Sequence, residues 1–154
     1  MRRFDVSVCV FVAADCPLPE ARPSRECPLH VDLEGNTVHE GRADDNFSLL
    51  LFDDVSVYCE KKYGVYLELP AYTNGRAKQI LDYIRSVLRQ TESAELWNVW
   101  LLGCWEYDDR PYIHRKTVPI DDLTVADIKG IIDAKNWNGK DPQRPSFYCM
   151  EIVR

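Results

Sequence analysis

The chain has 154 residues, of which 45% are hydrophobic and 29% are charged, and its formal net charge is −6. These values are typical of one ordinary globular domain, 1–154, and exclude an intrinsically disordered chain. The acidic balance argues against a nucleic-acid-binding surface, which needs clustered lysine and arginine, and no apolar stretch of the sequence is long enough to span a bilayer.

The N-terminal segment contains an apolar run bracketed by Asp5 and Asp15. Such a run superficially resembles a short signal peptide. However, its valines alternate with other residues, which is typical of a half-buried strand, whereas the apolar region of a signal peptide is uniformly apolar. The pattern therefore predicts a first strand from Phe4 to Ala13 and a cytoplasmic protein.

Six cysteines are present, and most of them lie in apolar, strand-like runs. In such runs free cysteine behaves as a small buried hydrophobe, so reduced thiols are expected at Cys9, Cys59, Cys104 and Cys149. A proline-rich excursion over residues 14–28 contains the other two. Cys16 and Cys27 are the only pair that we consider for a disulfide.

The next stretch predicts short strands separated by turns. Leu29–Asp32 and Thr37–Glu40 form a small hairpin in which Gly35 supplies the turn conformation. Three further segments, Phe47–Phe52, Val55–Glu60 and Val65–Leu69, are predicted to form an antiparallel meander.

The clearest helix in the sequence follows. Its apolar residues Ala77, Ile80, Leu81, Ile84 and Leu88 fall on one stripe, while Arg76, Lys78, Asp82, Arg85 and Arg89 face away. Thr73 or Asn74 is expected to cap its N-terminus. The helix leads to a strand at Leu96–Cys104, and this order suggests a right-handed crossover, although an antiparallel arrangement also fits the lengths.

The C-terminal third predicts two more strands and one helix. Tyr112–Ile120 is expected to form a hairpin with the strand before it, through residues 106–111. Thr124 and Asp127 form a variant capping box that begins a helix, and Phe147–Val153 is the last strand. The expected fold is a single α+β domain with a mixed, mostly antiparallel sheet of six or seven strands and two main helices on one face.

The most conspicuous run of the sequence is the tryptophan-rich segment Glu95–Trp105. Alternation along a strand places Trp97 and Trp100 on opposite faces of the sheet. One face is expected to meet the helices. The other carries Trp100, either covered by the proline-rich excursion or exposed as a binding platform, and we interpret the run as sheet core.

Acidic pairs occupy several predicted turns and give the candidate binding residues. If some of these turns gather at one edge, they form a surface that attracts a basic partner and speeds its association. The candidate partner-binding residues are Asp53, Asp54, Trp105, Glu106, Tyr107, Asp108 and Asp109.

Metal binding and nucleophilic catalysis receive little support from the sequence. Cys16, Cys27, His30 and His39 could supply zinc ligands, but they lack the two tight ligand pairs of a structural zinc site. A cysteine with His30, His39 or His114 could form a dyad, yet no nucleophile motif and no phosphate-binding glycine cluster is present. We expect no catalytic residue, no metal and no cofactor.

As an acidic α+β chain with the strand Leu96–Leu101 and the closing strand segment Tyr148–Ile152, this sequence resembles bacterial toxin-immunity proteins in general character, mainly over Glu92–Arg154. The resemblance implies a non-enzymatic protein that neutralises a cognate toxin by direct binding to a basic toxin domain. It carries over no functional residue. The alternative is a small enzyme or ligand-binding domain that uses the open face of the sheet.

Overall fold

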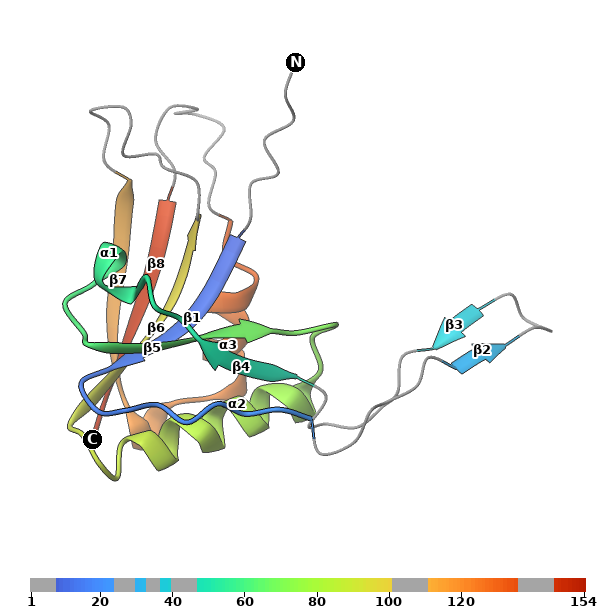
Figure 1. The fold of residues 1–154 in the computed structure, drawn as a ribbon, viewed down its shortest axis with the longest axis horizontal. Helices are drawn as coiled ribbons and strands as arrows, with labels where there is room; N and C mark the ends of the chain where they lie inside the picture. Colours follow the sequence, from blue (N-terminus) through green and yellow to red (C-terminus); the bar gives the residue numbers. More distant parts are fainter. Residues whose placement is uncertain (1–7, 24–29, 33–36, 40–46, 101–110, 136–145) are drawn as a thin grey trace, which may run out of the picture.

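The computed structural model describes residues 8–23, 30–32, 37–39, 47–100, 111–135 and 146–154. Its main element is a mixed six-stranded sheet in the order β4-β5-β1-β6-β8-β7 (Figure 1). The strands are β1 (Val8–Ala14), β4 (Ser48–Leu51), β5 (Tyr63–Glu68), β6 (Ser93–Trp100), β7 (Tyr112–Pro119) and β8 (Ser146–Val153). The helices are α1 (Val55–Tyr58), α2 (Asn74–Val87) and α3 (Val125–Ile132), with a 3-10 turn, η2, at Ile120–Asp122. The predicted α+β fold class is confirmed, and no helix of the described residues is long and apolar enough to cross a membrane.

Two helical crossovers organise the sheet. Strands β5 and β6 both pair antiparallel with β1, so they run parallel to each other with β1 between them, and α2 connects them. Strands β7 and β8 pair directly and in parallel, and α3 lies in their connection. Parallel strands need such crossovers because a tight turn reverses the chain direction.

The predicted hairpin between Leu96–Cys104 and Tyr112–Ile120 is wrong, because β8 lies between β6 and β7. The burial of the two strands explains this order. β8 is buried along most of its length, as a strand with neighbours on both sides must be, whereas β7 is exposed at nearly every residue. Charged residues such as Arg115 and Lys116 are tolerated at the edge of a sheet and would be costly inside it.

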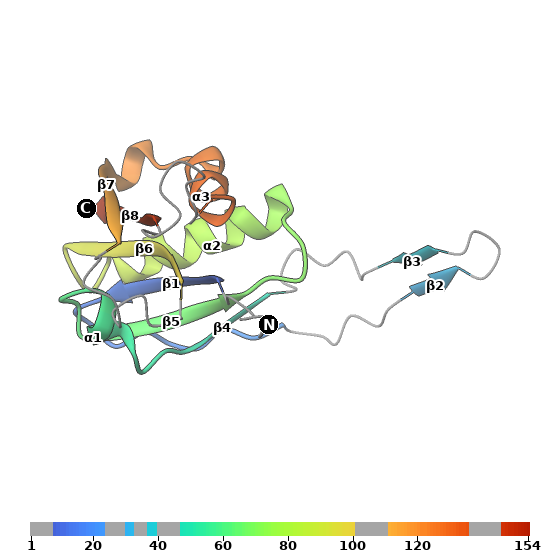
Figure 2. The ribbon, with the colours of Figure 1, turned by 90° about the horizontal axis from the view of Figure 1, so that it is seen from above.

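Helices α2 and α3 cover one face of the sheet (Figure 2), where the larger apolar core lies. Both helices begin at a side-chain cap, as predicted. Thr73 Oγ1 accepts a hydrogen bond from Arg76 N at 3.1 Å. Thr124 Oγ1 accepts from Asp127 N, and Asp127 Oδ2 accepts from Thr124 N at 2.9 Å, which completes the capping box.

Arg76 departs from its predicted outward position and is only 3% exposed. Its side chain turns back over the segment before α2, where Nη1 donates to the Ala71 carbonyl at 2.8 Å. A long side chain near the start of a helix covers the preceding turn, so helical periodicity alone does not decide its exposure.

The sheet face opposite α2 and α3, here called the far face, carries a second apolar cluster. Its buried members are Cys9, Phe11, Ala13, Val55, Trp97, Val99, Phe147 and Cys149. The predicted strand Val55–Glu60 is wrong, because these residues form the one-turn helix α1 on the far face instead. Both edges of β5 are occupied by β4 and β1, so no pairing position beside β5 is left. Gly64 allows the close approach of α1, since a Cβ there would lie 3.0 Å from the Cβ of Val55.

The tryptophans of β6 follow the predicted alternation only in part. Trp97 is fully buried on the far face, opposite the face that packs against the helices. Trp100 is half-buried and packs against the same far-face cluster, where alternation predicts the other face. Strand β8 pairs with β6 only as far as Asn98, so Trp100 lies beyond this pairing and its ring is less confined.

The proline-rich excursion covers the β4 edge of the sheet. Ala21 and Leu49 exchange two backbone hydrogen bonds of 2.9 and 2.8 Å, and the Glu20 carboxylate accepts from Leu51 N at 3.0 Å. Cys16 is a free thiol, and Cys27 lies outside the described residues. The predicted hairpin is confirmed as β2 (His30–Asp32) and β3 (Thr37–His39), which lie apart from the main sheet in both views (Figures 1 and 2).

Asn98 is a buried amide that joins the sheet to α3. Its Nδ2 donates to the Ile131 carbonyl at 2.7 Å and lies 3.4 Å from the carbonyls of Ile132 and Ala134. The last carbonyls of a helix have no partner within the helix. A side chain from the centre of the sheet therefore fixes where α3 ends.

Replacing this amide should destabilise the fold. For Asn98→Ala we expect a loss of about 1–3 kcal/mol in the free energy of unfolding, because buried helix carbonyls lose their donor. Urea denaturation measures the change. Gln79→Ala, at an exposed amide on α2, is the control and should change stability by less than about 0.5 kcal/mol. Equal effects of the two substitutions would contradict the role assigned to Asn98.

Candidate functional site

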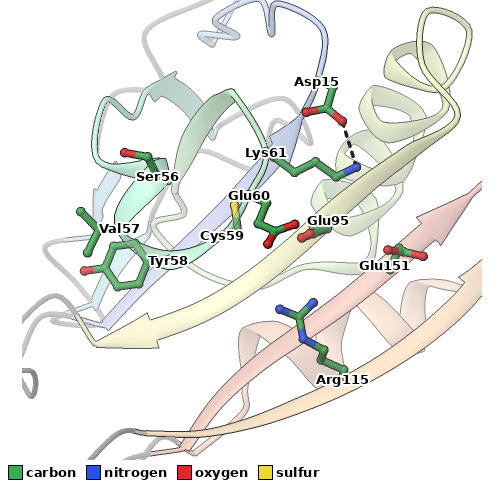
Figure 3. Close-up of a pocket in the computed structure, with 10 residues that line it drawn as sticks. All are labelled: Asp15, Ser56, Val57, Tyr58, Cys59, Glu60, Lys61, Glu95, Arg115 and Glu151. Carbon is green, nitrogen blue, oxygen red and sulfur yellow. Dashed lines mark hydrogen bonds and ion pairs between the residues drawn. The ribbon is translucent and has the colours of Figure 1, made fainter. Parts of the chain in front are cut away.

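The far face carries a cleft of about 540 Å³ between α1 and the strands β6, β8 and β7 (Figure 3). This volume lies within the range of about 300–1,000 Å³ that is usual for ligand sites. The cleft is lined by Asp15, Ser56, Val57, Tyr58, Cys59, Glu60, Lys61, Glu95, Arg115 and Glu151. Its four carboxyl groups outnumber its two cations.

Strand register brings the charged residues together. Glu95 on β6 is the direct partner of Glu151 on β8, and Arg115 on β7 is the partner of Cys149. Residues opposite each other on adjacent strands point to the same face. Side chains from three strands therefore meet over one area, and α1 together with Cys59, the residue that follows it, forms the opposing wall.

The guanidinium of Arg115 rests on an aromatic surface. Its central carbon lies 5.1 Å from the centroid of the Trp97 ring, a cation–π contact, and Nη1 lies 3.8 Å from Cys149 Sγ. Phe11 stacks with Trp97 at a centroid distance of 6.0 Å. Among the described residues, no carboxylate forms an ion pair with Arg115.

The second cation of the cleft is already paired. Lys61 Nζ lies 3.3 Å from Asp15 Oδ2 and donates to Ser93 Oγ at 2.8 Å (Figure 3). The charge of Asp15 is therefore compensated within the cleft, whereas Glu60, Glu95 and Glu151 form no ion pair with any described residue.

Glu95 is the most unusual of these carboxyl groups because it is 4% exposed. Desolvation by burial raises its pKa above the ordinary value, and the charge of Glu151 raises it further. Arg115, Lys61 and the indole N–H of Trp97 act in the opposite direction, with less effect. Trp97 Nε1 is buried and lies outside full hydrogen-bond geometry, so its interaction with Glu95 is a weak one.

The thiols around the cleft are poor nucleophiles. Burial raises the pKa of Cys9 and of Cys59 to about 11, and burial together with the charge of Glu95 raises the pKa of Cys149 to about 12. A thiol attacks as the thiolate, so these three groups are nearly inert at neutral pH.

The histidines do not line this cleft. His114 stacks on Tyr148 at 4.8 Å, and its Nε2 lies 3.1 Å from Ser146 Oγ. His30 and His39 are register partners in the β2–β3 hairpin. Within the described ranges, no group of three or more histidine, cysteine, aspartate and glutamate side chains is arranged to hold a metal ion.

The structure brings together a different set of residues from the predicted one. Asp53 and Asp54 are exposed in the turn before α1, and neither lines the cleft. The remaining predicted residues, 105–109, lie outside the described residues. Sequence reasoning missed Glu95, Arg115 and Glu151. For Glu95 the available signal was a charged residue within an apolar run of a predicted strand, because burying a charge is costly and such positions are often functional.

Comparison with protein-family models, with curated proteins and with solved structures gave no significant match.

Because the pKa of Glu95 is raised, the stability of the folded protein should depend on pH. A carboxyl group whose pKa is higher in the folded state binds its proton more tightly when folded, so stability falls as pH rises from the ordinary glutamate pKa of 4.5 through the raised value. Glu95→Gln should therefore raise the melting temperature at about pH 8 and have little effect at about pH 4. The control is Glu68→Gln, at an exposed glutamate. A Glu95→Gln protein that melts lower than the wild type at both pH values would show that the carboxylate stabilises the fold.

The thiols make a second prediction. Alkylation of Cys9 and Cys149 by iodoacetamide in the native protein at about pH 7.5 should be at least about tenfold slower than in urea, because both thiols are buried and protonated. Mass spectrometry of the digested protein follows each cysteine separately. Native labelling of Cys149 at the unfolded rate would mean that this side of the sheet opens freely.

Proposed function

We propose that this protein is a non-enzymatic binding protein and that its far-face cleft receives a basic group of a protein partner. The observation that supports this most is the buried Glu95 beside Glu151, in a cleft whose carboxyl groups outnumber its cations. Unpaired carboxylates around a cleft attract a basic surface, speed its association and select against acidic partners.

The proposed partner is a bacterial toxin domain, and the proposed role is that of a cytoplasmic immunity protein. The net charge of −6 suits a basic, nuclease-like toxin surface. Asp53 and Asp54 extend the acidic surface beside α1. The acidic segment Glu106–Asp109, with Trp105 and Tyr107, is proposed as a further contact.

General acid–base catalysis by Glu95 is the second candidate, since a carboxyl group with a raised pKa in a cleft beside an arginine is typical of active sites. Stoichiometry separates the two functions. A binding protein abolishes the activity of one equivalent of its partner and leaves any excess partner active. An enzyme would inactivate many equivalents of the partner.

The test is co-expression with the product of each flanking gene. One product should be toxic alone, harmless together with this protein, and recovered with it in a one-to-one complex. Glu60→Lys and Glu151→Lys, two charge reversals in the cleft, should weaken the complex by about tenfold or more each, because a basic surface would then meet a like charge. Glu68→Lys, at an exposed residue outside the cleft, is the control and should bind like the wild type.

Two outcomes would contradict the proposal. One is that no flanking gene product binds. The other is that charge reversal in the cleft, at Asp53 and Asp54, and in the segment 106–109 all leave binding unchanged.

A further inference from the structure

We propose that the cleft recognises arginine: the guanidinium of one partner arginine enters it and is held between the carboxyl groups of Glu95 and Glu151. This inference rests on the proposed function and specifies the group that the cleft receives. Three features of the cleft support it: the placement of the two carboxyl groups, the burial of one of them, and the planar aromatic groups around them.

The first feature is strand register. Glu95 and Glu151 are direct partners on the adjacent strands β6 and β8. Cβ atoms in such a pair lie about 4.5–5.5 Å apart on the same face. Both side chains line the cleft, and neither has an ion-pair partner among the residues that the structure describes. Two like charges so placed repel each other, and a cation between them removes the repulsion.

The second feature is that Glu95 is already desolvated. It is 4% exposed before any partner arrives. The usual obstacle to a buried ion pair is the free energy of removing both groups from water. Here folding has already removed Glu95 from water, so the remaining cost falls on the incoming cation and on Glu151, which is half-buried. A pre-organised, unpaired carboxylate therefore gives the cation a larger net attraction than an exposed one.

The third feature favours guanidinium over ammonium. Guanidinium is planar, is more weakly hydrated and offers five donors in a fork, so it suits two carboxylates and an aromatic surface at once. Lysine has a compact, strongly hydrated charge. The ring of Tyr58 lines the cleft, and the floor already holds the guanidinium of Arg115 on Trp97. The cleft thus already holds one guanidinium against an aromatic ring.

The positive charge of Arg115 repels a second cation in the cleft. Replacing Arg115 therefore tests whether the cleft binds a cation or an anion. Arg115 occupies the β7 side of the cleft, and its side chain points toward the carboxyl groups (Figure 3). If the cleft binds a cation, Arg115→Gln removes a repulsion and should tighten binding. If Arg115 binds an anionic group instead, the same substitution should weaken binding of that anion.

The experiment uses the full chain and two blocked amino acids, Nα-acetyl-arginine methylamide and Nα-acetyl-lysine methylamide. Titration is followed by NMR at the indole N–H of Trp97, which adjoins Glu95. We expect the arginine probe to bind at least about fivefold more tightly than the lysine probe, because the planar, weakly hydrated fork suits two carboxylates and an aromatic surface better than a compact, strongly hydrated ammonium does. Glu95→Gln and Glu151→Gln should each weaken arginine binding by roughly tenfold, and Arg115→Gln should strengthen it.

Glu68→Gln is the matched control and should bind the arginine probe like the wild type. Loss of binding in Glu95→Gln is not a loss of fold, because its melting temperature at about pH 8 is expected to rise. The inference is overturned if the two probes bind equally, if neither binds, or if acetate binds and is lost in Arg115→Gln. Because the proposed function is tested by co-purification of the partner, and not by these probes, the two can fail separately.

Discussion

Strand β6 is buried on both faces, and the rest of the structure depends on this constraint. It lies between β1 and β8, so its side chains have only two environments. Leu96 and Asn98 point toward the helices, where Asn98 binds the end of α3. Glu95, Trp97 and Val99 point to the far face, where the apolar cluster forms below α1. Glu95 points to the far face, where residues 56–61 lie across the cleft from it, so its carboxyl group is largely removed from water in the folded protein.

The cleft follows from where the apolar cluster ends. Toward Val99 and Phe147 the far face is filled by aromatic and aliphatic side chains, and α1 packs against them through Val55 and Tyr58. At Glu95 and Glu151 the same strands present carboxyl groups, which cannot pack in this way. Lys61 pairs with Asp15 and Arg115 rests on Trp97, so within the described residues neither cation forms an ion pair with Glu95 or Glu151, although both lower the pKa of Glu95. The negative charge that is left over gives the cleft its preference for a basic ligand.

Much of the fold could be predicted because its elements are specified locally. The stripe of α2, the capping box at Thr124 and the alternation in β1 depend on nearby residues. The order of β7 and β8 was predicted wrongly because segments adjacent in sequence were paired, although Arg115 and Lys116 suit an edge strand and the more apolar β8 suits an inner position. The helix at Val55 depends on a distant event, the occupation of both edges of β5. The candidate site is missed for the same reason: Glu95, Glu151 and Arg115 lie far apart in sequence and meet only through strand register.

The most direct test of this account is an NMR titration of the Glu95 side-chain carboxyl carbon in the intact protein. We expect a pKa above the ordinary glutamate value of 4.5 in the unliganded protein, and a lower pKa once an arginine side chain occupies the cleft. An ordinary pKa that does not respond to the arginine probe would contradict it, because Glu95 would then be solvated or already paired.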